Sequence, residues 1–96
     1  MLGPEKKVEI KIRKYIQSLG GYSLKTLGGS VPIGTPDLIA CINGYFIAIE
    51  VKREKGGRVT PIQLRKIQDI KDAGGIAFVA NSVELVKENL QNEGVI

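Results

Sequence analysis

The sequence predicts an α/β protein in which helices flank a mixed central sheet, in the order helix, three strands, helix, strand and helix. Three observations support this fold class. The first segment has apolar residues at helical spacing, an Asn-Gly turn joins two alternating apolar runs, and a capped helix precedes an apolar strand. With 43% hydrophobic and 25% charged residues, the chain is expected to form a single domain over residues 1–96.

The first half of the chain is expected to supply one helix and three strands. Apolar residues recur at helical spacing over residues 5–19, basic residues occupy the other faces, and two glycines then end the helix. A short strand is expected over residues 22–26, followed by a loop rich in Gly and Pro. Asn43 and Gly44 predict the turn of a hairpin whose strands are the apolar runs on either side.

The second half is expected to supply two helices and a fourth strand. Thr60 has the residue type of a helix N-cap, a proline follows it, and Gln63 completes a capping-box pattern. Two glycines end this helix before an apolar strand over residues 76–80. Ser82 then caps a last short helix.

The predicted hairpin register brings two carboxylates together. A two-residue turn pairs residue 42 with residue 45 and continues outward until Asp37 faces Glu50. Opposite side chains project to the same side, with Cβ atoms roughly 4.5–5.5 Å apart. Lys52 lies on that side too, because it is two residues beyond Glu50. The other face of the hairpin is wholly apolar, so the charges collect at one end of one face.

Two interpretations of these charges are open. In the first, Asp37 and Glu50 are rim charges that are solvated and paired with Lys52 or Arg53. In the second, the charged residues form a metal site. Like charges directly opposite each other destabilise a strand pair unless something such as a divalent cation compensates them. Three charged residues on one face beside a Gly- and Pro-rich loop favour the site.

The residue inventory limits which metal and which chemistry are expected. The chain has no histidine and one cysteine, Cys41, which excludes a zinc site within one chain and any His-dependent catalytic triad. A bound metal is therefore expected to be a hard cation held by oxygen, such as Mg²⁺ or Mn²⁺. A net charge of +4 favours a polyanionic partner. No long apolar run or signal segment is present, so an intracellular protein of cytoplasm or nucleoid, host-encoded or viral, is expected.

The motif Pro36-Asp37, a gap of twelve residues, and Glu50-Val51-Lys52 resembles the PD-(D/E)xK motif of restriction-endonuclease-like nucleases. The stretch GTPDLIACINGYFIAIEVKREKGGRVTPIQ, followed by an apolar helix, two glycines and a strand, is similar to the virus-type replication-repair nuclease (VRR-NUC) domain. The likeness runs over nearly the whole chain. The three charged residues alone are a weak signal, but the GxPD start, the hairpin, the TPxQ helix start and the order of elements make it specific.

The resemblance implies a restriction-endonuclease-like fold and a metal-dependent DNA endonuclease. It implies that Asp37, Glu50 and the backbone carbonyl of Val51 bind Mg²⁺ or Mn²⁺. Lys52 would orient or activate the attacking water, or stabilise charge developing on the phosphate. No nucleotide cofactor and no membrane are implied.

Two further positions of the family pattern lie on the helices. Gln63 matches one of them, although a capping box alone would also explain this residue. A glutamate of the first helix matches the other, with Glu5 as the better alignment and Glu9 in reserve. Both glutamates also fit the ordinary role of acids near a helix N-terminus.

Basic residues near the motif and on the first helix are predicted to contact DNA phosphates. They are Arg53, Lys55, Arg58, Lys6, Lys7 and Lys11. Aromatic residues are sparse, which argues against stacking on single-stranded bases and favours duplex or branched duplex DNA.

Resemblance to stand-alone members implies a homodimer that cuts branched DNA such as a four-way (Holliday) junction, in DNA repair and recombination. A dimer contact is expected at the last helix or at Val95 and Ile96. The alternatives are a non-catalytic DNA-binding module that retains the fold, and a structural or partner-binding domain with rim charges.

Overall fold

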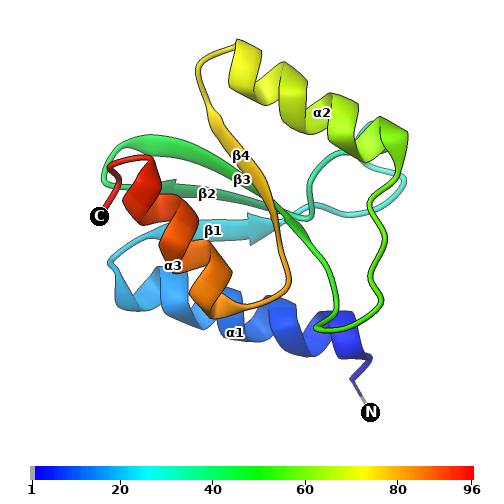
Figure 1. Cartoon of the computed structure of the whole chain (residues 1–96), viewed down its shortest axis with the longest axis horizontal. Coiled ribbons are helices and arrows are strands. Elements are labelled where there is room, and N and C mark those ends of the chain that lie inside the picture. The colour runs from blue at the N-terminus through cyan, green and yellow to red at the C-terminus, as the bar shows by residue number, and fades with distance from the viewer. Residues whose placement is uncertain (1) are drawn as a thin grey trace.

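The computed structural model describes residues 2–96, which form a four-stranded sheet and three helices (Figure 1). The elements are α1 Pro4–Ser18, β1 Tyr22–Lys25, β2 Leu38–Ile42, β3 Tyr45–Val51, α2 Pro61–Asp72, β4 Ile76–Ala80 and α3 Val83–Asn92. The strand order is β1-β2-β3-β4, antiparallel up to β3 and parallel between β3 and β4. The predicted mixed sheet and element order are confirmed.

The hairpin between β2 and β3 has the predicted turn and register. Asn43 has a φ of 52° and Gly44 a φ of 84°, as a type I′ turn requires at both central positions. Ile42 pairs with Tyr45, and the pairing continues to Leu38 opposite Ile49. One further step outward places residue 37 opposite residue 50. A slip of one residue would send the charged side chains into the core, so this register is a precondition of the site.

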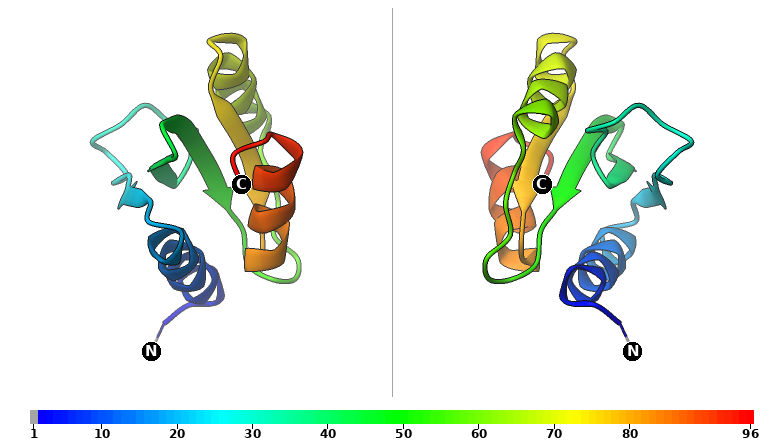
Figure 2. Two further views of the ribbon diagram at one scale, coloured as in Figure 1. Left: turned by 90° about the vertical axis from the view of Figure 1, so that its left-hand side faces the viewer. Right: turned by 90° about the vertical axis from the view of Figure 1, so that its right-hand side faces the viewer.

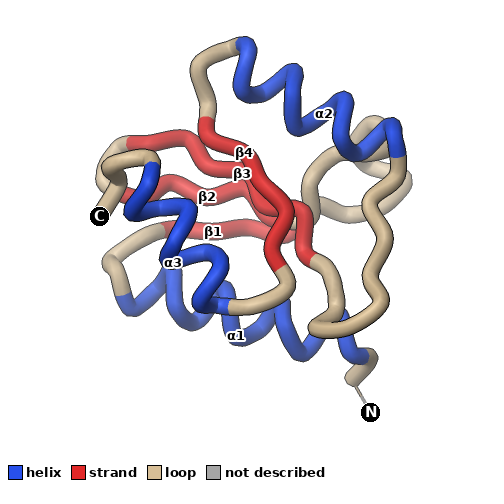
Figure 3. The backbone as a smooth tube through the Cα atoms, viewed as in Figure 1, coloured by secondary structure: helices blue, strands red, loops and turns tan. Residues whose placement is uncertain are grey.

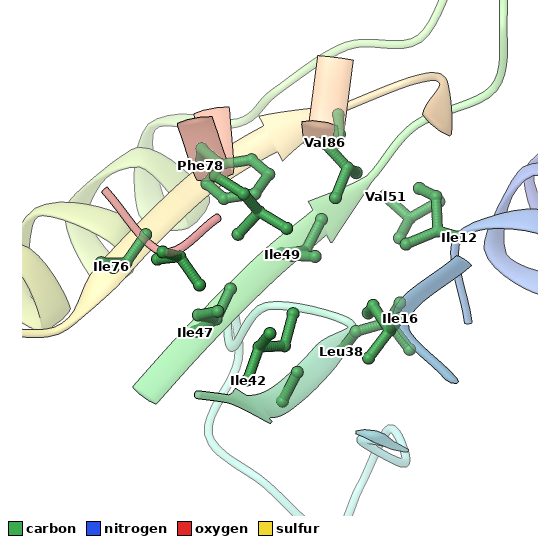
Figure 4. Close-up of a cluster of buried hydrophobic side chains, with 14 of the residues drawn as sticks. Ile12, Ile16, Leu38, Ile42, Ile47, Ile49, Val51, Ile76, Phe78 and Val86 are labelled. Carbon is green, nitrogen blue, oxygen red and sulfur yellow. The ribbon is translucent and has the colours of Figure 1, made fainter. Parts of the chain in front are cut away.

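The two faces of the sheet are covered by different helices. Figures 1 and 3 show α1 and α2 on opposite sides of the strands. The larger core lies between the sheet, α1 and α3, and Figure 4 shows its side chains converging from these elements. It includes Ile12, Ile16, Leu38, Ile42, Ile47, Ile49, Val51, Ile76, Phe78 and Val86. This is the wholly apolar hairpin face that the sequence predicts.

The opposite face carries a smaller core under α2. Ile67 of α2 packs with Ala48 of β3 and Ala77 of β4, and α2 contacts these two strands. Figure 2 shows, in two views, that α2 lies away from α1. The half of this face formed by β1 and β2 has no helix over it among the described residues.

The C-terminal segment packs against its own chain. Val95 is buried in the main core, and its carbonyl oxygen accepts a hydrogen bond from Asn43 Nδ2 at 2.8 Å. The expectation that Val95 provides a dimer contact is therefore wrong, because its side chain already fills the core. Within residues 2–96, no helix has the length and apolar character needed to cross a membrane.

Candidate active site

The predicted site residues meet at one end of the sheet. Asp37 comes directly before β2, Glu50 is the penultimate residue of β3, and Lys52 follows that strand. Gln63 is in the first turn of α2. In Figure 1 this is the right-hand end of the sheet, where β2 starts, β3 ends and α2 begins.

Asp37 is held against the end of β3 by backbone hydrogen bonds. Its Oδ2 accepts a hydrogen bond from the Val51 N–H at 2.9 Å. Its own carbonyl oxygen accepts from the Thr26 N–H at 2.8 Å and from Thr26 Oγ1 at 3.2 Å. Pro36 before it is fully buried. Asp37 is therefore fixed through its backbone by Thr26, which follows β1, and through its carboxylate by β3.

Glu50 is a buried carboxylate with one oxygen unpaired. The residue is 3% exposed. Its Oε2 accepts a hydrogen bond from Gln63 Nε2 at 3.2 Å and lies 3.3 Å from Lys52 Nζ. Its Oε1 is the one buried side-chain polar atom in the described part of the chain that lacks a hydrogen-bond partner. Burial, and then the nearby Asp37 carboxylate, raise the pKa of Glu50 to about 7 against the opposing effect of Lys52.

Gln63 forms the predicted capping box and also contacts the acid and the lysine of the motif. Its backbone N–H donates to Thr60 Oγ1 at 3.2 Å, and its Oε1 accepts from the Thr60 N–H at 3.0 Å, which completes the capping box. The same Oε1 accepts from Lys52 Nζ at 3.1 Å, while Nε2 donates to Glu50. The cap orients the amide so that it bridges the acid and the lysine of the motif.

The two candidate glutamates of α1 occupy different environments. Glu9 is 3% exposed and is paired with Lys25 at 2.8 Å and Lys6 at 2.9 Å. Burial acts to raise the pKa of Glu9, but its hydrogen bonds to the two lysines together lower it below the ordinary value. Glu5 is exposed and lines a hollow that also reaches Lys52. Glu5 therefore opens onto the site, whereas Glu9 is enclosed in ion pairs.

The basic residues predicted to contact DNA gather around two neighbouring hollows between α1 and the loop after β3. The first, of about 500 Å³, is lined by residues that include Glu5, Lys6, Lys52, Arg53 and Arg58. The second, of about 400 Å³, is lined by residues that include Lys7, Lys11, Arg53 and Lys55. All six predicted residues thus line these two hollows, the first of which also includes Lys52 of the motif.

Two residues that fix predicted acids in place were missed from the sequence. Thr26 bonds the backbone of Asp37, and Lys25 pairs with Glu9. A signal for Lys25 did exist, because strand alternation places it opposite Leu38, on the face that packs against α1. A lysine at an inward strand position requires an acidic partner. Nothing in the local sequence marks Thr26.

The donor atoms at this end of the sheet fit a hard divalent cation. In residues 2–96, no three acidic, cysteine or histidine side chains lie close enough together to hold a metal ion without other ligands. Asp37 and Glu50 supply two carboxylates, and a third oxygen would have to come from the backbone, as predicted for Val51. The unpaired Glu50 Oε1 beside a second carboxylate is the arrangement that a cation would compensate.

Comparison with known proteins gives one family. The sequence model of the VRR-NUC domain matches residues 4–84. A solved structure described as a VRR-NUC domain is similar with a TM-score of 0.79 and 26% identity, covering 94% of this chain and 97% of the other. A second, described as a VRR-NUC domain protein, has a TM-score of 0.73 and 23% identity, covering 96% and 89%. No curated protein sequence matches the chain.

Proposed function

Because the chain belongs to the VRR-NUC domain family, which gives it a nuclease fold with DNA as substrate, we propose that it is a metal-dependent DNA endonuclease. In this proposal it hydrolyses phosphodiester bonds with Mg²⁺ or Mn²⁺ held by Asp37, Glu50 and the Val51 carbonyl oxygen. The substrate is branched duplex DNA such as a four-way junction, and the active form is a homodimer.

One observation carries the proposal: Glu50 Oε1 is buried without a hydrogen-bond partner beside the Asp37 carboxylate. A rim charge would be solvated, and a structural ion pair would satisfy both oxygens. This carboxylate is neither. A buried acid with one unpaired oxygen, next to a second acid and a lysine, is a group of residues typical of a catalytic metal site.

The residues around the acids suit the hydrolysis of a phosphodiester. A bound divalent ion supplies Lewis acidity and lowers the pKa of a coordinated water. Lys52 places a positive charge beside the acids, where it offsets negative charge that develops on the phosphate oxygens. Gln63 fixes the direction of Lys52 and of Glu50 at once. Asp37 is already immobilised by the Val51 N–H, so little reorganisation is needed.

Charge and shape support a duplex rather than a single strand. The basic hollows, the first of which includes Lys52 of the motif, contain lysine and arginine with no aromatic side chain. Phosphate contacts of this kind follow the backbone of a duplex without reading its sequence. A two-fold dimer would present two such surfaces and two sites to the two-fold arms of a junction.

The test is cleavage of labelled DNA of defined shape. A four-way junction, a flap and a linear duplex of matched sequence are incubated with the protein and Mg²⁺, Mn²⁺ or EDTA. We expect cleavage with either metal, none with EDTA, and a preference for the branched substrates.

Glu50→Gln should abolish cleavage, whereas Glu88→Gln, an exposed glutamate of α3, should leave it unchanged. Binding of the junction without cleavage under any metal would instead identify a non-catalytic DNA-binding module. Absence of DNA binding at low salt would overturn both the endonuclease and the DNA-binding module, because phosphate contacts are strongest at low salt.

A further inference from the structure

Two rows of apolar side chains lie in register on the α2 side of the sheet, running from the part that α2 leaves uncovered to Ala48, which is buried beneath α2. Tyr22 of β1 pairs with Cys41 of β2, and Cys41 pairs with Phe46 of β3. Leu24, Ile39 and Ala48 form the next row in the same way. Opposite residues project to the same side, so these six side chains share the α2 side of the sheet. We call this surface the β1–β2 face.

The β1–β2 face is exposed where its residues are largest. Tyr22 is 68% exposed and Phe46 is 51% exposed. The solvent face of a sheet normally carries polar side chains, and contiguous apolar patches on a soluble domain mark contact sites. The face continues into an apolar hollow of about 680 Å³ between α2 and the 32–36 loop, lined in part by Pro32, Ile39, Phe46 and Ile70. The patch is therefore continuous with the hollow beside α2.

The charges around the β1–β2 face indicate which kind of partner fits it. The two rows contain no charged residue, and the basic hollows proposed for DNA lie on the α1 side of the molecule. At the rim of the hollow, α2 contributes Lys66 and Asp69, which carry opposite charges. A surface that carries both signs at its rim and none at its centre complements a second copy of itself, as a two-fold contact requires.

We propose that the β1–β2 face is the contact between two copies of this chain. The inference rests on the proposed function only in that a homodimer was proposed there. A standard interface buries roughly 800 Å² of each partner, about an eighth of the 6006 Å² that the chain exposes. The two rows, the hollow and the exposed Ile33 on its flanking loop are the surface that would supply this area.

The register also indicates where the two-fold axis lies. Cys41 is the middle residue of its row, between Tyr22 and Phe46. With the axis parallel to β2 and running between the two sheets at this residue, Tyr22 of one copy lies over Phe46 of the other, and the two Cys41 side chains face each other. The contact leaves α1 and the basic hollows free for DNA. Asp37 and Glu50 are the next pair on the same side of the sheet, so an axis parallel to β2 brings the two candidate sites to the same end of the dimer.

The experiment measures mass without DNA or metal, so that its outcome is independent of cleavage. Sedimentation of the protein in EDTA at micromolar concentration should give twice the 10.4 kDa chain mass. A short bismaleimide should link two chains through Cys41, the single cysteine, and Cys41→Ser should abolish the link. Phe46→Glu and Tyr22→Glu should each raise the dimer dissociation constant about 100-fold, because exposed aromatic residues at the centre of a contact dominate its energy.

Tyr45→Glu is the matched control. Tyr45 precedes Phe46 in β3 and is also exposed, but it pairs with Ile42 and projects to the other side of the sheet. It should leave the dissociation constant unchanged within about twofold. Circular dichroism melting should show that all three variants are folded. A monomeric wild-type chain, a failure to cross-link through Cys41, or equal effects of Tyr45→Glu and Phe46→Glu would each overturn the proposal.

Discussion

Glu9 of α1 and Glu50 of β3 are buried to the same extent, at 3% exposure each, but their surroundings are opposite. Glu9 lies within 2.9 Å of two lysines, Lys6 and Lys25. Glu50 lies 3.3 Å from one lysine and shares its surroundings with Asp37. Burial acts to raise the pKa of both. The two lysines reverse that effect at Glu9, whereas the second carboxylate reinforces it at Glu50.

The comparison shows that burial of an acid does not by itself mark a site. The ion pairs of Glu9 use both of its oxygens and connect α1 to β1, so they account for its burial within the fold. Glu50 keeps an oxygen without a partner, and the fold alone offers no compensation for it. A buried polar atom without a hydrogen-bond partner is expected where a residue is selected for function rather than for stability.

The largest difference should appear in cleavage. Glu50→Gln keeps the shape of the side chain and removes its charge, so we expect DNA cleavage to fall by about 1,000-fold or more. Glu9→Gln should keep cleavage within about tenfold at a temperature where the variant is folded, because Glu9 is enclosed by its lysines. Single-turnover rates at saturating Mg²⁺ measure both. Equal losses of cleavage rate in the two variants would place Glu9 in the catalytic site. The distinction between Glu9 and Glu50 would then be wrong.

The next largest difference concerns pH. The pKa of Glu50 is about 7 in the folded protein against an ordinary 4.5, so the folded state holds the extra proton between these values. The free energy of unfolding should therefore decrease as pH rises from 4.5 to about 7, by up to about 3 kcal/mol, and level off above. Glu9 has the opposite sign: its pKa lies below 4.5, so its contribution is lost as pH falls below that value.

Urea unfolding across this pH range in EDTA measures the effect. Glu50→Gln should flatten the decrease between pH 4.5 and 7, and Glu9→Gln should leave it in place. Mg²⁺ should raise the melting temperature more at about pH 8 than at about pH 5, because the cation competes with the proton for Glu50. If the free energy of unfolding still decreased over this pH range in Glu50→Gln, the decrease would come from another titrating group.

A smaller effect is expected on stability when Glu9 is changed. Glu9→Gln leaves Lys6 and Lys25 without a charged partner, but both lysines are partly exposed and can turn to water. We expect a loss of about 1–2 kcal/mol in the free energy of unfolding at neutral pH. Glu50→Gln should instead gain stability there without metal, since it removes an uncompensated charge. Denaturant midpoints of both variants, with Glu88→Gln as control, measure the expected loss of stability in Glu9→Gln and the expected gain in Glu50→Gln.

The sequence predicted the part of the site that local rules determine. The Asn43-Gly44 turn sets the register that brings Asp37 to Glu50, and alternation then places Lys52. It preferred Glu5 to Glu9 by alignment alone and gave no physical reason to separate them, because both lie on one side of one helix. The difference between them comes from Lys25, which meets Glu9 only when β1 packs on α1. The exposed rows of the β1–β2 face escaped prediction for the same reason, since only the position of α2 leaves them uncovered.

Gln63 gives the finest test, because it joins helix capping to the acid that the comparison singles out. Gln63→Glu retains a capping-box residue, so the helix start should keep its stability, but it replaces the amide that donates to Glu50 with a third carboxylate. Thr60→Ala removes the cap and leaves the amide, at a cost of about 1 kcal/mol. We expect Gln63→Glu to slow cleavage about tenfold with little change in melting temperature, and Thr60→Ala to lower the melting temperature with little change in rate. If both variants changed only the melting temperature, Gln63 would serve only as a helix cap. The position and charge of Glu50 in catalysis would then depend on Asp37 and Lys52 and not on Gln63.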